Sequence, residues 1–218
     1  MDAAEYDAWY DTPRGRWIGE TEFHLAQRML DSRPPESMLD VGCGTGWLTR
    51  RFAATGMAAT GLDINGDWIA FARRQNDAKT AWLEGDARRL PFEDQSFDTV
   101  LSIAALCFIE GERQALAEIV RVARRRFAVG WLNRSSLLYH AKAGQGAYRG
   151  ATWRTAGEIR RLFHGLPVRN LTIQSAVFLP NGGWLAEMLE ELLPGTLPNG
   201  ALLMAAGEPE RRPAPSQG

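Results

Sequence analysis

Three glycines at alternate positions follow a short apolar run in the stretch LDVGCGTGWL, residues 39–48. Glycine adopts the positive φ angles of a tight turn and lets the backbone come close to a ligand. A helix that begins directly after such a turn presents free N–H groups to that ligand. The stretch therefore predicts an adenine-nucleotide-type site between a strand and a helix.

The sequence of this loop argues against two common kinds of nucleotide-binding site. A dinucleotide fingerprint reads GxGxxG, but residues 42–46 read GxGxG, and Trp47 stands where the third glycine would fall. An indole there cannot give the close helix–strand packing, or the access for a pyrophosphate, that the third glycine provides. NAD and FAD are therefore disfavoured. A Walker loop is excluded because no GK[ST] follows.

Two acidic residues follow later apolar runs. Asp63 closes the second run, where a carboxylate can accept hydrogen bonds from both hydroxyls of a ribose. Asp86, in the sequence Gly-Asp-Ala, follows the third run, where an acceptor can take an adenine amino group. Ligands of open α/β sheets bind at the carboxyl ends of the strands, so we expect these residues and the glycine loop to converge on one crevice.

The elements that must position these residues alternate between strands and helices. We expect strands at residues 38–41, 58–63, 80–84, 97–103 and 127–132, and helices at about 16–31, from Leu48 to Gly56, from Asn65 onward and at 112–124. This alternation favours βαβ units on a parallel sheet. A short helix with a capping-box start is expected at 155–163. Two final strands are expected at 168–179 and 201–206, joined by a connection that contains 184–193.

The composition is that of an ordinary globular domain. The 218 residues are 45% hydrophobic and 23% charged with a net charge of −1, which gives no global attraction to nucleic acid or anionic lipid. Two cysteines and three isolated histidines predict neither a disulfide framework nor a metal site. No leader pattern or membrane-length apolar run occurs, so a cytoplasmic location is expected. We expect one domain over residues 1–207 and a disordered, proline-rich tail over 208–218.

Four motifs in order, LDVGCGTG, GLDIN, GDARRLPF and FDTVLSIAALCFIE, resemble those of class I S-adenosylmethionine-dependent methyltransferases. The pattern is most similar to the small-molecule subgroup typified by enzymes of ubiquinone and menaquinone biosynthesis. The resemblance implies a Rossmann-like, seven-stranded, mostly parallel sheet with an antiparallel last strand and helices on both faces. It also implies S-adenosylmethionine as cofactor and in-line transfer of its methyl group to a small-molecule acceptor.

The resemblance assigns cofactor roles residue by residue. The acidic side chain of the first motif would reach the methionine amino group, and the glycines would wrap the methionine and ribose. The later acidic residues would take the ribose hydroxyls and the adenine edge, and the end of the fourth strand would border the sulfonium. Trp68 departs from the family, which usually has Met or Leu there. The assigned residues are Asp40, Gly42, Cys43, Gly44, Gly46, Asp63, Ile64, Trp68, Asp86, Ala87, Ser102 and Ile103.

The acceptor half of the site is less defined. The (N/D/S)PP(Y/F) signature of amino-group nucleic-acid methyltransferases is replaced by Ser-Ile-Ala-Ala at 102–105, and no proline–cysteine nucleophile occurs; both absences favour a small molecule. The aromatic N-terminal segment, residues 1–35, either packs on the sheet or forms a lid. Residues 133–154 are expected to form an acceptor-side insertion. Within them Tyr139, His140 and Tyr148 are the candidate proton acceptors or orienting groups.

Two other functions share these binding motifs. A non-enzymatic module that binds S-adenosylmethionine or S-adenosylhomocysteine, as a sensor or partner subunit, would carry the same residues. An aminopropyltransferase on the same fold would be expected to carry further acidic residues for a polyamine, and no such cluster follows the fourth expected strand. Turnover on any acceptor separates an enzyme from the binding module.

Overall fold

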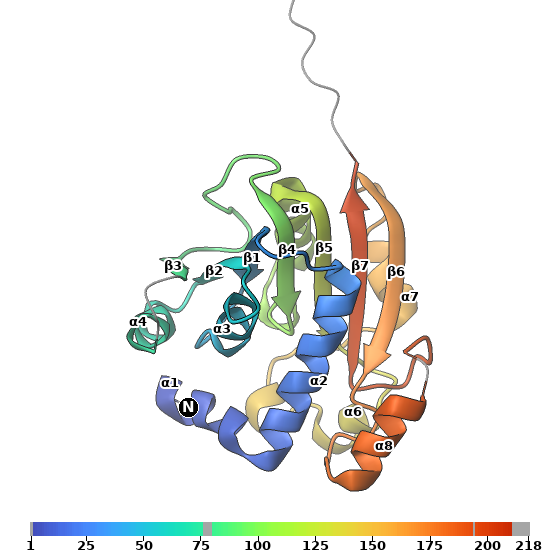
Figure 1. Ribbon diagram of the computed structural model, residues 1–218. Coiled ribbons are helices and arrows are strands. Elements are labelled where there is room, and N and C mark those ends of the chain that lie inside the picture. The colour runs from blue at the N-terminus through green and yellow to red at the C-terminus, as the bar shows by residue number, and fades with distance from the viewer. Residues whose placement is uncertain (1, 76–79, 194, 211–218) are drawn as a thin grey trace, which may run out of the picture.

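A computed structural model describes residues 2–75, 80–193 and 195–210 (Figure 1). In this part of the chain seven strands form one sheet in the order β3-β2-β1-β4-β5-β7-β6. The strands are β1 (Ser37–Val41), β2 (Ala58–Asp63), β3 (Ala81–Glu84), β4 (Phe97–Ile103), β5 (Ala123–Leu132), β6 (Val168–Ala176) and β7 (Leu202–Pro209). β7 pairs antiparallel with β5 and β6, whereas the other pairs are parallel. The expected Rossmann-like fold with an antiparallel last strand is confirmed.

Helices cover both faces of this sheet. Figure 1 shows α2 crossing one face, with α5 behind the other. The helices are α1 (Ala3–Ala8), α2 (Pro13–Leu30), α3 (Trp47–Ala53), α4 (Gly66–Arg74), α5 (Glu112–Val122), α6 (Leu137–Lys142), α7 (Ala156–Leu162) and α8 (Trp184–Leu192), with single turns η1 (Trp9–Asp11), η2 (Leu106–Phe108) and η3 (Gly146–Tyr148). The capping box predicted at Thr155 and Glu158 is present at the start of α7. No described helix combines the length and apolarity of a membrane span.

The boundary between α5 and β5 lies earlier than predicted. We expected the helix to reach residue 124 and the strand to begin at 127, but α5 ends at Val122 and β5 begins at Ala123. The basic residues at 124–126 therefore lie on the strand. Strand geometry lets them reach acceptors at the end of α2, directly before β1 and on β4, and these long-range contacts outweigh the local helical pattern.

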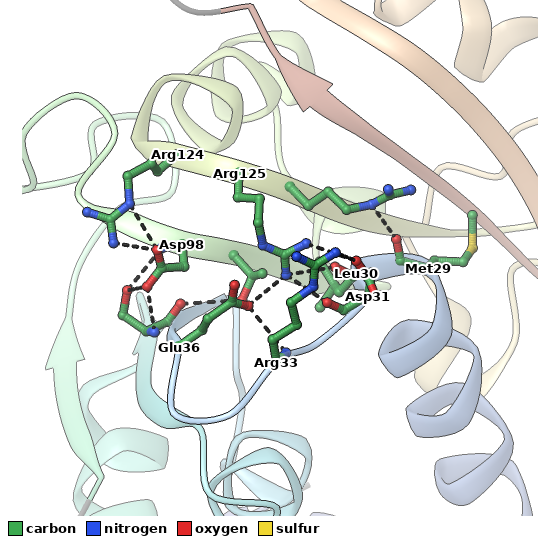
Figure 2. Close-up of polar contacts among 11 residues, drawn as sticks. Met29, Leu30, Asp31, Arg33, Glu36, Asp98, Arg124 and Arg125 are labelled. Atoms are coloured by element: carbon green, nitrogen blue, oxygen red, sulfur yellow. Dashed lines mark hydrogen bonds and ion pairs between the residues drawn. The ribbon is translucent and has the colours of Figure 1, made fainter.

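Arginine side chains of β5 hold the C-terminal end of α2 (Figure 2). Arg125 Nη2 donates to the carbonyl oxygens of Leu30 and Asp31, at 3.1 and 2.8 Å, and to Glu36 Oε2 at 2.7 Å. Arg126 Nε donates to the Met29 carbonyl oxygen at 2.8 Å. The last carbonyls of a helix have no partner within the helix, so these bonds satisfy them and attach α2 to the sheet.

The C-terminal part contains more regular structure than predicted. α8 occupies the stretch expected to be a connection, β6 ends at Ala176, and α6 and η3 lie within the insertion 133–154. β7 continues to Pro209, so two residues assigned to the tail belong to the sheet. Glu208 reaches Arg169 Nε at 3.2 Å from this strand, which explains part of its extension. Of the rest of the expected tail, residues 211–218 lie outside the described residues.

The parallel strands end at one edge of the sheet, and this edge positions the candidate site. Asp40 is next to Gly61 in the β1–β2 register, and Asp63 is next to Glu84 in the β2–β3 register. In Figure 1, α1, α6 and α8 lie at this end of the sheet. The glycine loop, Asp63 and Asp86 are thereby brought to the same edge, as the sequence predicts.

Candidate functional site

A cavity of about 690 Å³ lies at the carboxyl ends of β1 to β4. It is lined by every residue predicted to hold the cofactor except Gly46 and Ser102. Its volume is within the usual range of small-molecule sites. Residues at the ends of several strands and residues of the N-terminal segment line one pocket. The residues predicted to hold the cofactor therefore lie close together.

The three glycines of the loop have different roles. All have positive φ, at 74°, 58° and 81° for Gly42, Gly44 and Gly46. A Cβ on Gly46 would lie 2.2 Å from the Trp82 ring, so this glycine gives close packing behind the loop and does not line the cavity. A Cβ on Gly42 would lie 2.3 Å from that of Ala105. Gly44 faces the cavity beside Trp68.

Asp63 joins the end of β2 to the glycine loop. Its Oδ2 accepts a hydrogen bond from the Gly44 backbone N–H at 2.8 Å, and its Oδ1 accepts one from the Asn65 N–H at 2.9 Å. A carboxylate oxygen has two lone pairs, so each oxygen keeps capacity for a further donor. The carboxylate is thus held in place without being saturated, which suits a pair of ribose hydroxyls.

Asp40 is a buried acid at the start of the loop. It is only 2% exposed, and its Oδ2 accepts a hydrogen bond from Thr49 Oγ1 at 2.6 Å. Burial raises the pKa of Asp40 to about 7. Thr45, which sequence reasoning missed, is also buried in the loop, and its hydroxyl has no hydrogen-bond partner within the described residues. The residue lines the cavity, but its hydroxyl oxygen is itself buried.

Asp86 is engaged by a neighbouring cation. It accepts hydrogen bonds from the Arg88 backbone N–H and from Arg88 Nη2, both at 2.8 Å, and these contacts lower the pKa of Asp86. Arg88 also lines the cavity, although no sequence pattern singled it out. Ala87 is buried between the two, at the position predicted for the adenine edge.

Aromatic rings of the N-terminal segment form part of the cavity wall. Tyr6 stacks on Trp68 with ring centroids 4.8 Å apart, and Tyr10 stacks on Trp47 at 4.5 Å. All four rings line the cavity. Trp47 therefore contributes to the site as well as to packing. The N-terminal segment covers part of the pocket in addition to lying near the sheet.

Arg50 connects this segment to the loop. Its Nη2 donates to Asp7 Oδ1 at 3.0 Å and its Nη1 donates to the carbonyl oxygen of Thr45 at 2.7 Å. The guanidinium thus joins α1 to the glycine loop through one side chain on α3. A helix and a loop far apart in sequence are in this way fixed on the same side of the cavity.

Glu22 is a cavity residue that sequence reasoning missed. It lies on α2, half-buried, and burial raises its pKa to about 8. A signal was available in the sequence, because Glu22 is spaced one helical turn from Ile18 and Ala26, both of which are buried. An acid on the apolar face of a helix faces either the core or a site.

Of the two residues at the end of β4 that were predicted to border the sulfonium, one lines the cavity and the other does not. Ile103 lines the cavity, but Ser102 is fully buried away from it, because adjacent strand residues point to opposite faces. The following loop contributes further lining residues that were quoted in the fourth motif without a role. They are Ala104, Ala105, Phe108, Ile109 and Glu110.

The three acceptor-side candidates do not line this cavity. Tyr139 and Tyr148 pack on the buried ring of Trp153, at centroid distances of 5.4 and 5.5 Å. His140 lies at a second, smaller cavity beside α8. Among the described residues of the insertion 133–154, Ala147 alone lines the main cavity. Both tyrosine rings pack on Trp153 and are not part of the cavity lining. The described residues contain no group of three or more potential metal ligands.

Comparisons with known proteins agree with this geometry. Residues 39–126 match the methyltransferase domain family. An uncharacterized protein of Mycobacterium tuberculosis is 36% identical over 192 residues, covering 83% of this chain and 63% of that protein. The malonyl-(acyl-carrier protein) O-methyltransferase of Erwinia pyrifoliae is 37% identical over 108 residues, covering 48% of this chain and 41% of that enzyme. The chain thus spans less than two thirds of the length of either relative.

The fold comparison extends over nearly the whole chain. A crystal structure of an S-adenosylmethionine-dependent methyltransferase from Thermotoga maritima superimposes with a TM-score of 0.70 at 20% identity, covering 94% of each chain. The resemblance to the ubiquinone and menaquinone subgroup stays a prediction. Residues 39–126 thus match the methyltransferase domain family, and the chain shares its fold with a solved S-adenosylmethionine-dependent methyltransferase.

Proposed function

We propose that this protein transfers the methyl group of S-adenosylmethionine to a small-molecule acceptor inside the 690 Å³ cavity. The observation that carries the proposal is the convergence of Asp40, the glycine loop, Asp63 and Asp86 on one pocket at the carboxyl ends of the strands. Ligands of open α/β sheets bind at this edge. A small acceptor agrees with a pocket that is enclosed by aromatic rings.

The residues present fit the cofactor. Asp63 keeps acceptor capacity for the ribose hydroxyls, and Asp86 with Ala87 lies where an adenine edge would be recognised. Asp40 offers a polar contact to the amino-acid portion. Ile64 is an exposed apolar side chain at the cavity, available to cover one face of the adenine.

When bound, S-adenosylmethionine supplies an electrophilic methyl group on a sulfonium. The chain's own contribution is to hold the acceptor in line with that methyl carbon and to exclude water, and such positioning supplies much of the rate of a bimolecular reaction. The aromatic faces of Tyr6, Tyr10 and Trp47 are suited to the positive charge of the sulfonium.

Calorimetric titration of the Asp63→Asn variant tests the cofactor half. The substitution removes the charge and one acceptor, so binding of S-adenosylmethionine and S-adenosylhomocysteine should weaken by about 1.5–3 kcal/mol, as for hydrogen bonds to a charged group. The wild-type protein should bind both with micromolar affinity and should not bind NAD. Asp67→Asn is the matched control, because Asp67 lies on the exposed side of α4 and does not line the cavity.

Thermal unfolding of both variants separates a folding defect from a binding defect. Equal affinity of wild type and Asp63→Asn for S-adenosylmethionine would overturn the assignment of the site. Release of S-adenosylhomocysteine in the presence of any acceptor would exclude the non-enzymatic binding module. Binding without turnover on a broad set of acceptors would favour that module.

A further inference from the structure

Glu22 has surroundings that cofactor binding does not explain. Its side chain lines the cavity, and no hydrogen bond or ion pair joins its carboxyl group to any other described residue. Buried or half-buried carboxyl groups nearly always have a polar partner in native proteins. An unpaired acid that faces a cavity is therefore a candidate for contact with a ligand.

The groups that face Glu22 from neighbouring elements are neutral phenols. Burial raises the pKa of Tyr6, Tyr10 and Tyr148, and the charge of Glu22 raises each of them further. Arg14 acts on Tyr148 from the same helix as Glu22, but its Nε donates to the carbonyl oxygen of Pro180 at 2.6 Å. Within the described chain, no cationic side chain therefore pairs with the carboxyl group of Glu22.

Most ionisable residues that line the cavity are acidic. Its acidic lining residues are Glu22, Asp40, Asp63, Asp86 and Glu110. Among the described lining residues Arg88 is the one cation, and it is paired with Asp86. An anionic acceptor would find no free cation in this pocket, whereas a positively charged acceptor would find an unpaired acid.

We propose that Glu22 recognises the methyl acceptor and that this acceptor is a small amine with an apolar body. The inference rests on the proposed methyltransferase function and names the acceptor class of the same cavity. The apolar body would lie against the aromatic walls, where Tyr10, Trp47 and Phe108 are available. The ammonium group would pair with the carboxylate of Glu22.

The reaction of an amine needs the nitrogen lone pair. The N–H bond of the ammonium breaks and its proton passes to the Glu22 carboxylate. The freed lone pair forms a bond to the methyl carbon while the C–S bond breaks, and that electron pair stays on sulfur. The products are a methylated ammonium, S-adenosylhomocysteine and a protonated Glu22. Burial, which raises the pKa of Glu22 to about 8, makes its carboxylate a stronger base for this step.

Two probes of equal shape and opposite charge test the proposal. We would titrate the protein, saturated with S-adenosylhomocysteine, with 2-phenylethylamine and with 3-phenylpropanoate. Wild type should bind the amine at least ~10-fold more tightly, the effect of a charged hydrogen bond. Glu22→Gln should reduce this preference to within about 3-fold, while Glu20→Gln, on the same helix but facing Arg51, should retain it.

Proton release gives a second readout. With a pKa of about 8, the carboxyl group of Glu22 is mostly protonated at pH 7 in the free protein, whereas in the proposed amine complex the carboxyl and amine groups hold one acidic proton fewer. Amine binding should therefore release close to ~1 proton more in wild type than in Glu22→Gln, measured by calorimetry in buffers of different ionisation enthalpy. Asp40, with its pKa of about 7, is present in both proteins, so the difference isolates Glu22.

The outcomes separate this inference from the proposed function. Equal binding of the two probes, undetectable binding of both, or a preference for the carboxylate would overturn the inference while S-adenosylhomocysteine still binds. Retention of the amine preference and proton release by Glu22→Gln would also overturn it. Failure of wild type to bind S-adenosylhomocysteine would overturn the proposed function, and the inference with it.

Discussion

Three aspartates of the cavity show how the surroundings of a residue set its properties. Asp63 accepts two backbone hydrogen bonds at the end of β2. Asp86 is half-exposed, and its bonds to Arg88 lower its pKa. Asp40 is buried with a single hydroxyl donor, and burial raises its pKa. One residue type thus provides a fixed acceptor, a charge-neutralised acceptor and an acid that titrates near neutral pH.

Asp40 should make stability depend on pH. Its pKa is about 7 in the folded protein against an ordinary 3.8, so the folded state holds a proton that the unfolded state releases between these values. The free energy of unfolding should therefore fall as pH rises from about 4 to about 7, by at most ~1.4 kcal/mol per pH unit for this group.

The variant Asp40→Asn should lack this component while keeping the bond from Thr49. Urea unfolding of both proteins at several pH values between 4.5 and 7.5 measures the difference, and Glu22 contributes equally to both. Parallel curves for wild type and variant over this range would contradict the assignment of a neutral, buried Asp40.

At the scale of elements, the position of α2 determines one wall of the cavity. This helix carries Glu22, and its C-terminal end is held by arginines on β5 (Figure 2). These side chains satisfy backbone carbonyls far away in sequence, which no local pattern reveals.

Arg125→Ala should destabilise the protein by about 1.5–3 kcal/mol, because two helix carbonyls and Glu36 lose a charged donor. Arg124→Ala is the control. The Arg124 side chain is 53% exposed and pairs with Asp98, so its loss should cost no more than about 1 kcal/mol. Urea unfolding at one pH measures both. Equal losses would show that the contacts to α2 add nothing beyond a surface ion pair.

At the scale of the whole molecule, the sequence predicts the sheet and the cavity residues at the strand ends much better than the rest of the cavity wall. The residues proposed to bind the cofactor lie in short motifs at strand ends, so strand order alone brings them together. The rest of the wall includes Tyr6, Glu22 and Ala147, which only the tertiary fold brings to one cavity. The ends of β5 and β7 were also misplaced, since pairing and ion pairs across the sheet fix them.

Because the cavity wall comes from distant segments, cofactor binding should order them together. Hydrogen–deuterium exchange should slow in residues 42–48 and in 3–11 when S-adenosylhomocysteine binds, since Tyr6 and Tyr10 line the same pocket as the loop. Residues 156–162 of α7, which contribute nothing to the cavity, should be unaffected.

Asp7→Ala removes the contact from Arg50 that attaches α1 to the loop. In the free protein it should speed exchange in residues 3–11 by about 5-fold, equivalent to roughly 1 kcal/mol for a partly buried ion pair. The ligand should then restore part of the protection, because the aromatic wall re-forms around it. Protection of 42–48 without any change in 3–11 would show that the N-terminal segment packs beside the site and does not close over it.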